Sequence, residues 1–163
     1  MTLLSDQDII YKLENRSMKI DPFRERNLTP NGYDLTISEV YTRNPEGKVT
    51  IGAVYLEHGD WCLVSTREFL EIPPNICGSL HLRSSFVRKG LLAGFGLVDA
   101  GFKGTLTFSI TNVGPERVAL PIGERICQIA LHQLSSDPQH LYGSRSGTYQ
   151  GQRGVTLDGG KRV

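Results

Sequence analysis

The stretch Gly96-Leu97-Val98-Asp99-Ala100-Gly101-Phe102-Lys103-Gly104 places one carboxylate and one aromatic ring in a turn bracketed by glycines. Apolar residues alternate with polar or small residues on both sides of it, over residues 91–98 and 104–112. A period of two is typical of half-buried β-strands, so the sequence predicts two strands joined by this turn. The turn suits a small pocket for a planar ligand beside a water-activating base. The alternative is that Asp99 is an ordinary turn aspartate.

Short strands of this kind are predicted along most of the chain. They cover residues 33–38, 49–51, 61–64, 68–72, 76–82, 91–98, 104–112, 117–120 and 126–134. Turn sequences such as Pro73-Pro74-Asn75 and Pro121-Ile122-Gly123 separate them. Many short strands at this spacing predict a mainly β fold, a sandwich, barrel or jelly roll. The lack of a second long helical pattern disfavours an α/β fold.

The two ends of the chain depart from this pattern. Ser5 followed by Asp8 is close to a capping box, and Ile9, Ile10 and Leu13 fall on one helical face, so a short helix ending near Asn15 is expected. From residue 135 the chain is polar, basic and rich in glycine, which indicates either a disordered tail or a lid that orders over an anion. We therefore expect one domain over residues 1–163, with a helix and β core in 1–134 and a tail or lid in 135–163.

Composition narrows the classes of partner. The 163 residues carry a formal net charge of +1, so neither nucleic acid nor a membrane surface is expected as a partner. No apolar run approaches the roughly 20 residues of a membrane span, and residues 1–8 lack the pattern of a signal peptide. The three widely spaced cysteines are expected to be buried, reduced thiols of a cytoplasmic protein. The cysteines and the four histidines have no zinc-site spacing.

Three further segments carry side chains suited to an anion. Residues 83–88 (RSSFVR) carry two serine hydroxyls between two arginines, and arginine guanidinium groups match the geometry of phosphate. The alternative is a helical turn with solvated cations. Asp34, in the motif NGYDL, is either a structural turn acid or a functional carboxylate. Gln128 lies in an apolar strand, where its amide either faces outward or binds an anion.

Taken in order, the motifs NGYDL (31–35), RSS (83–85), VDAGFKG (98–104), PIGERICQI (121–129) and the Gly/Arg-rich tail resemble the superfamily of dUTP pyrophosphatases and dCTP deaminases over nearly the whole chain. LLSDQDI (3–9), KIDPF (19–23) and YQGQRG (149–154) resemble the dCTP deaminase branch in particular. The resemblance implies a distorted jelly roll and a homotrimer with active sites shared between subunits. It also implies a deoxynucleoside triphosphate substrate that carries Mg²⁺, with no direct protein ligand and Asp34 as a candidate contact through water.

One strand position separates the two activities of this superfamily. The resemblance implies that its deaminases carry, ten residues after the turn aspartate, a glutamate that moves protons while water attacks cytosine. Here that residue is Ser109, whose un-ionised hydroxyl cannot serve as the base. The pyrophosphatase branch has a small or apolar residue there, and Thr148 stands where deaminase tails often carry a lysine. We therefore predict a dUTP diphosphatase that forms dUMP and pyrophosphate. A dCTP deaminase or bifunctional enzyme, and a non-catalytic nucleotide-binding regulator, are the alternatives.

The resemblance also implies roles for individual residues. Asp99 would orient and partly deprotonate the attacking water. Phe102 would stack under the deoxyribose and exclude a 2′-hydroxyl, unless its ring is simply packed in the core. The full set expected to bind substrate is Arg83, Ser84, Ser85, Arg88, Phe102, Gln128, Tyr149, Gln152 and Arg153.

Overall fold

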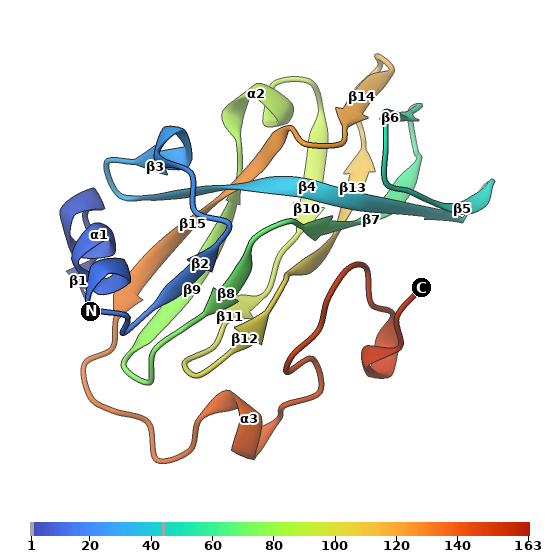
Figure 1. Ribbon diagram of the computed structural model, residues 1–163. Coiled ribbons are helices and arrows are strands. Elements are labelled where there is room, and N and C mark those ends of the chain that lie inside the picture. The colour runs from blue at the N-terminus through green and yellow to red at the C-terminus, as the bar shows by residue number, and fades with distance from the viewer. Residues whose placement is uncertain (1, 44) are drawn as a thin grey trace.

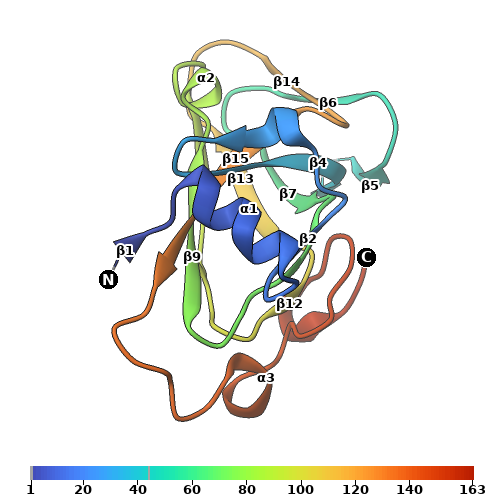
Figure 2. The same cartoon turned by 60° about the vertical axis from the view of Figure 1, so that its left-hand side comes forward.

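The computed structural model describes residues 2–43 and 45–163, and its architecture is dominated by one curled antiparallel sheet (Figures 1 and 2). The helical elements are α1 (Asp6–Glu14), η1 (Glu25–Asn27), α2 (Ser84–Val87), α3 (Tyr142–Arg145) and η2 (Asp158–Gly160). The strands are β1 (Thr2–Leu3), β2 (Lys19–Asp21), β3 (Leu28–Thr29), β4 (Gly32–Arg43), β5 (Glu46–Val49), β6 (Ala53–Leu56), β7 (Trp61–Thr66), β8 (Phe69–Glu71), β9 (Ile76–Leu82), β10 (Leu91–Gly94), β11 (Leu97–Val98), β12 (Lys103–Gly104), β13 (Thr107–Asn112), β14 (Val118–Pro121) and β15 (Arg125–Gln133). The prediction of a mainly β fold with an N-terminal helix is confirmed.

The large sheet curls so that its two end strands approach each other before the turn that follows β11. Its strands run in the order β10-β13-β7-β4-β15-β9-β11, so β10 and β11 form the two opposite ends of that order. Only residues 95 and 96 separate β10 from β11 along the chain. Because two residues cannot cross a flat sheet of this width, the sheet must curl until its two ends meet. The seam of this barrel-like sheet therefore lies directly before Asp99.

This seam corrects two of the sequence-based strands. The expected strand 91–98 is divided into β10, which pairs with β13, and β11, which pairs with β9. The expected strand 104–112 is divided into β12, which pairs with β8, and β13. Apolar residues continue on both sides of each break in the sequence, which is why the sequence pattern did not reveal the breaks. Strands β1, β2, β3 and β6 were not predicted, and the strand expected at 49–51 instead ends at Val49.

Strand β4 forms the centre of the core. Tyr33, Leu35 and Ile37 are fully buried, and Asp34 and Thr36 on the opposite face are buried as well. The segment η1–β3 covers that second face, where the Asn27 side-chain amide donates to the backbone oxygen of Asp34 at 3.0 Å. The face of β4 that carries Asp34 is thus enclosed, and this enclosure fixes the position of the Asp34 carboxylate.

The N-terminal helix forms as the sequence predicts. The Ser5 hydroxyl accepts the Asp8 N–H, and the Asp8 carboxylate accepts the Ser5 N–H, so the capping box is complete. Ile9 is fully buried against the sheet. Ile10 and Leu13 both line the groove between α1 and β2, and Ile10 is 37% exposed there.

Candidate functional site

The turn after β11 lines a pocket of about 350 Å³, called here the turn pocket. Its walls come from β9, β11, the 99–102 turn, β13 and the C-terminal segment, with the residues Leu80, Gly96, Leu97, Val98, Asp99, Phe102, Leu106, Thr107, Phe108, Tyr142, Tyr149 and Gln152. The lining is mostly apolar, with one carboxylate and a few polar groups. A pocket of this composition suits a small ligand with a flat apolar part.

Asp99 and Phe102 are held by the backbone of the turn itself. The Phe102 N–H donates to the Asp99 carbonyl at 3.1 Å, and Gly101 between them has a φ of +81°. A left-handed residue at this point favours glycine, so the motif DAGF specifies the turn. The Asp99 side chain is exposed, whereas the Phe102 ring is 5% exposed and packs edge-to-face on Tyr142 with centroids 5.6 Å apart. The carboxylate is thus accessible to water beside a fixed ring.

Ser109 lies next to the turn pocket, in an adjoining groove. On β13 it alternates with buried Phe108 and Ile110, and its side chain faces the groove that contains Trp61, Tyr149, Gln152 and Asp158. Tyr149 and Gln152 line both cavities, so the groove and the turn pocket are neighbours. Ser109 therefore presents a hydroxyl to this groove.

The C-terminal residues are folded against the turn rather than disordered. Tyr149 and Gln152, two of the residues expected to bind substrate, line the turn pocket. The Arg153 guanidinium stacks on the Phe69 ring, with its carbon 4.3 Å from the ring centroid. Arg153 is therefore held by a cation–π contact in this conformation.

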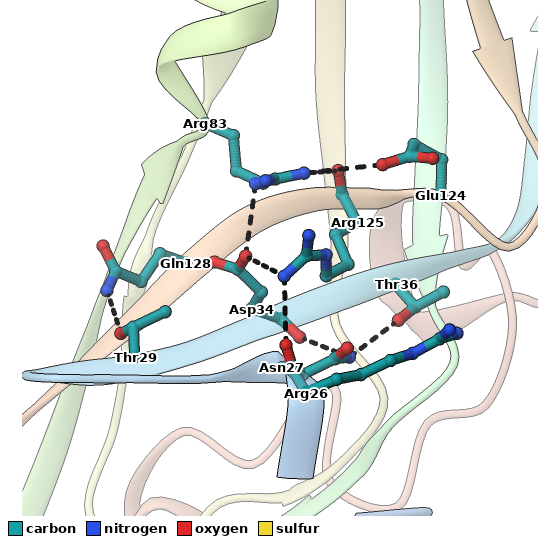
Figure 3. A network of polar contacts seen from close by, with 9 residues as sticks. All are labelled: Arg26, Asn27, Thr29, Asp34, Thr36, Arg83, Glu124, Arg125 and Gln128. Atoms are coloured by element: carbon teal, nitrogen blue, oxygen red, sulfur yellow. Dashed lines mark hydrogen bonds and ion pairs between the residues drawn. The ribbon is translucent and has the colours of Figure 1, made fainter. Parts of the chain in front are cut away.

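A second polar cluster gathers most of the other candidates, and Figure 3 shows its network. Asp34 Oδ2 pairs with Arg83 Nε at 3.2 Å and with an Arg125 guanidinium nitrogen at 3.3 Å. Arg83 also pairs with Glu124 at 3.4 Å and donates to the Arg125 carbonyl at 3.2 Å. Gln128, opposite Asp34 across β15 and β4, donates to the Thr29 hydroxyl at 2.5 Å. Asp34, Arg83, Arg125 and Gln128 are called the phosphate cluster after the role that is proposed for them, and the one buried acid among them, Asp34, is paired with two cations.

The environment of Asp34 explains its part in this cluster. Its burial raises the pKa of the carboxyl, while Arg83 and Arg125 act in the opposite direction. An aspartate with two guanidinium partners orients them both, which is a positioning role. Arg125 was not among the sequence candidates. The only signal for it was its place in the motif PIGERICQI, three residues before Gln128.

The remaining RSS-segment residues follow Arg83 in α2. Ser84 and Ser85 form the first turn of α2 and are exposed. This segment therefore forms the helical turn that the sequence offered as the alternative. Arg88 follows its last residue and lies in a groove with residues 115–119. The structure thus brings Arg83, Asp34 and Gln128 together, and places Arg88 outside their network.

The turn pocket and the phosphate cluster lie at opposite ends of the sheet. Both views show α2 at one end of the molecule and α3, which borders the turn pocket, at the other (Figures 1 and 2). Among the described residues, neither cavity lining that contains Tyr149 includes Arg83, Ser84 or Gln128. The candidate residues therefore form two separate groups within one chain.

The thiols and possible metal ligands can also be placed. Cys62, Cys77 and Cys127 are free and buried, as predicted, and burial raises the pKa of Cys62 to about 12. Within residues 2–43 and 45–163, no three His, Cys, Asp or Glu side chains are arranged to hold a metal ion. No helix of this part of the chain is long and apolar enough to span a membrane.

Comparison with known proteins identifies the family. A family model described as dCTP deaminase-like matches residues 45–134. The dCTP deaminase of Thermococcus kodakarensis is 36% identical over 152 residues, which cover 90% of this chain and 94% of that protein. This chain belongs to the dCTP deaminase-like family. A relative from Streptomyces coelicolor named "dCTP deaminase, dUMP-forming" is 32% identical over 180 residues, covering 94% of this chain and 93% of the relative.

Solved structures agree on the fold. A 2′-deoxycytidine 5′-triphosphate deaminase from Agrobacterium tumefaciens superposes with a TM-score of 0.69 at 21% identity, over 80% of this chain. The match spans 48% of that longer chain. The dUTPase of EIAV superposes with a TM-score of 0.53 at 22% identity, over 76% of this chain and 92% of the dUTPase. The fold is therefore the one shared by the deaminases and dUTPases.

Proposed function

We propose that this member of the dCTP deaminase-like family is a dUTP diphosphatase, which hydrolyses dUTP to dUMP and pyrophosphate. The observation that carries the proposal is Ser109. It faces the groove beside the turn pocket at the strand position where a deaminase of this superfamily needs its glutamate. Hydrolytic deamination requires proton transfer to and from the ring, and a serine hydroxyl does not supply a base at neutral pH.

Phosphoryl transfer needs fewer acid–base groups from the protein than deamination does. Asp99 is exposed at the mouth of the turn pocket, where its carboxylate orients a water and accepts a proton from it as the water attacks the α-phosphorus in line. Phe102, fixed by Tyr142, supports the deoxyribose. The α-phosphorus–oxygen bond to the β-phosphate breaks, and pyrophosphate leaves. Positioning and charge stabilisation then account for most of the rate enhancement.

The phosphate cluster supplies that charge. Arg83, oriented by Asp34, and the Ser84, Ser85 and Gln128 side chains offer cationic and neutral donors to phosphate oxygens. Because this cluster and the turn pocket lie at opposite ends of one chain, we propose that they meet between subunits of a homotrimer. Arg88 lies outside this network, and we assign it only a peripheral contact.

In this proposal Mg²⁺ would bind as a complex with the triphosphate of the substrate. Asp34 Oδ2 is bound by two guanidinium groups, so this oxygen is already occupied by the two cations. An ion held by phosphate oxygens and water suits the reluctance of Mg²⁺ to dehydrate. When bound there, the ion neutralises charge on the triphosphate.

Deamination of dCTP is the second candidate, because the named relatives at 32–36% identity are dCTP deaminases. Incubation of the protein with Mg²⁺ and either dUTP or dCTP, followed by chromatographic separation of the products, decides between the two. We expect dUMP and pyrophosphate from dUTP and unchanged dCTP. Formation of dUTP or dUMP from dCTP would contradict the proposal. Binding of dUTP without turnover would instead indicate a regulator.

A further inference from the structure

Glu68 is a fully buried carboxyl group that belongs to neither group of candidate site residues. It lies between β7 and β8, and its side chain is 0% exposed. Its Oε2 accepts the Thr36 N–H at 2.8 Å, whereas Oε1 has no hydrogen-bond partner within residues 2–43 and 45–163. Glu68 also takes part in none of the ion pairs of this part of the chain. An ionised Glu68 would therefore be a buried charge with no cation paired to it.

The titratable and charged groups around Glu68 offer little compensation for such a charge. Burial raises the pKa of Tyr33 and the pKa of Cys127, so both groups are neutral at neutral pH. Arg67 is the neighbouring cation, but it lies beyond ion-pair distance of the carboxyl, and Asp34 nearby is itself an acid. A buried carboxyl group in these surroundings takes up a proton rather than carry an unpaired charge.

Asn27, which also contacts Thr36, lacks a donor in the same way. It is 1% exposed, and its Nδ2 donates to the Asp34 carbonyl at 3.0 Å and to the Thr36 hydroxyl at 3.3 Å (Figure 3). These two bonds fix the orientation of the amide, and its Oδ1 is left without a partner in the described residues. The side chains around Thr36 thus include two buried acceptor oxygens without donors, and a proton on Glu68 adds one donor.

The segment that carries Asn27 also holds the arginines of the phosphate cluster. Arg125 donates to the Arg26 carbonyl at 3.1 Å while it pairs with Asp34. Arg83 pairs with the same oxygen of Asp34. A movement of η1 away from β4 would therefore disturb Asp34 and both guanidinium groups at once.

We propose that Glu68 keeps its proton in the folded protein and acts, through Thr36 and Asn27, as a positioning residue for Asp34 and its two arginines. When pH rises and the carboxyl releases its proton to solvent, the buried charge is relieved only if water reaches it. Water gains access when the η1–β3 segment moves away from β4, and the arginines then lose their fixed orientation. The effect on triphosphate binding rests on the proposed function, whereas the protonation state and the movement of the segment do not.

Infrared spectroscopy in ²H₂O tests the protonation state directly. At pH 6 a glutamate with the ordinary pKa of 4.5 is ionised. We nevertheless expect the difference spectrum of wild type minus Glu68→Gln to contain the carbonyl band of a protonated carboxylic acid at pH 6, and to lose this band by pH 9. Glu57→Gln, at an exposed glutamate paired with Arg117, is the control and is expected to change only carboxylate bands. A pure carboxylate spectrum for Glu68 at pH 6 would overturn the proposal, and a band that persists at pH 9 would overturn its pH response.

Hydrogen–deuterium exchange measures the movement of the segment without any ligand. Exchange of residues 24–31 is compared between the wild type and Glu68→Gln at the same pH, so that intrinsic exchange rates cancel. The glutamine keeps an acceptor for the Thr36 N–H and offers donor hydrogens at every pH. We expect equal exchange at pH 6 and exchange about fivefold faster in the wild type at pH 9, with β6 unchanged. Equal exchange at both pH values would overturn the coupling of Glu68 to the segment.

Calorimetric titration with α,β-imido-dUTP, a dUTP analogue with a non-hydrolysable α–β bridge, tests the link to the phosphate cluster. We expect the wild type and Glu68→Gln to have equal Kd values at pH 6, and the wild type to have a Kd about fivefold higher at pH 9. Ionisation of the ligand cancels in this ratio. A ratio of one at both pH values would overturn the positioning role.

Glu68→Leu extends this test, because leucine offers no acceptor to the Thr36 N–H. We expect it to raise Kd at both pH values, whereas the conservative glutamine does not at pH 6. Equal Kd values for Glu68→Leu and Glu68→Gln at pH 6 would contradict a role of this hydrogen bond in positioning. If the wild type binds no dUTP analogue, the proposed function fails, and the same comparison is made with dCTP, while the infrared and exchange results still decide the state of Glu68.

Discussion

Ser109 lies directly against the backbone of Gly94, its cross-strand partner: a Cβ built on Gly94 would come 2.6 Å from Ser109 Oγ. The two residues sit on β13 and β10, at the edge of the groove beside the turn pocket. The side chain at the position that separates the two proposed activities is thus accommodated by a glycine opposite it.

This relationship predicts an energetic coupling between the two positions. Gly94→Ala forces the Ser109 hydroxyl out of its rotamer, so we expect the free energy of unfolding to fall by about 1 kcal/mol. In a Ser109→Ala background the contact is gone, and Gly94→Ala is expected to be neutral or to stabilise by up to about 1 kcal/mol, since glycine is unfavourable within a strand. Urea unfolding of the four proteins measures the coupling. Equal effects in both backgrounds would contradict it.

Phe102 is expected to set the preference for deoxyribose. Phe102→Leu keeps an apolar side chain but removes the flat ring that packs on Tyr142. We expect the ratio of kcat/KM for dUTP over UTP to fall about tenfold, because discrimination by exclusion of one hydroxyl is of this order. Steady-state kinetics with both nucleotides measures the ratio, and Phe86→Leu, at a buried ring outside the turn pocket, is the control. An unchanged ratio would mean that Phe102 is only a core residue.

Arg83 is expected to require its guanidinium. Its Nε and terminal nitrogen contact Asp34, Glu124 and the Arg125 carbonyl together, and the single ammonium of Arg83→Lys cannot reproduce this fork. We expect KM for dUTP to rise at least tenfold with a smaller effect on the free energy of unfolding. Arg117→Lys, an exposed arginine paired with Glu57, is the matched control. Equal KM values in the two variants would remove Arg83 from the phosphate cluster.

Glu68 predicts a pH dependence of stability. It is fully buried, its Oε2 accepts the Thr36 N–H at 2.8 Å, and its burial raises the pKa above the ordinary value of 4.5. Below 4.5 the carboxyl is neutral in both states. As pH rises the unfolded chain ionises first, so stability falls until the folded pKa is passed.

The variant Glu68→Gln lacks this titration. We therefore expect the free energy of unfolding of the wild type to fall relative to that of the variant as pH rises from 4.5 to 8. Urea unfolding across this range measures the difference. A difference that rises with pH would show that the folded protein favours the charged carboxylate.

The sequence predicted the parts of this molecule that depend on local patterns. Period-two alternation located most strands, and the pairing of Ser5 with Asp8 located α1. The glycine at 101 marked the turn because a left-handed residue was needed there. Each of these signals lies within a few residues of the feature it predicts.

Long-range features left no such signal. The division of residues 91–98 depends on closure of the sheet, since β10 and β11 pair with strands at opposite ends of its order. The contact of Tyr142 with Phe102 joins residues forty apart and has no periodicity. Composition left the C-terminal residues open between a disordered tail and a lid, whereas buried Val155 anchors them to the core. The separation of Arg83 from Asp99 was likewise invisible in the order of the motifs.

The most direct test of the central claim is hydrolysis in water enriched in ¹⁸O, with products analysed by mass spectrometry. If Asp99 directs water to the α-phosphorus, dUTP yields dUMP with one ¹⁸O in its phosphate and unlabelled pyrophosphate, and dCTP yields no labelled uracil. Appearance of ¹⁸O at C4 of a uracil ring formed from dCTP would show that the protein is a deaminase despite Ser109, and would contradict the account.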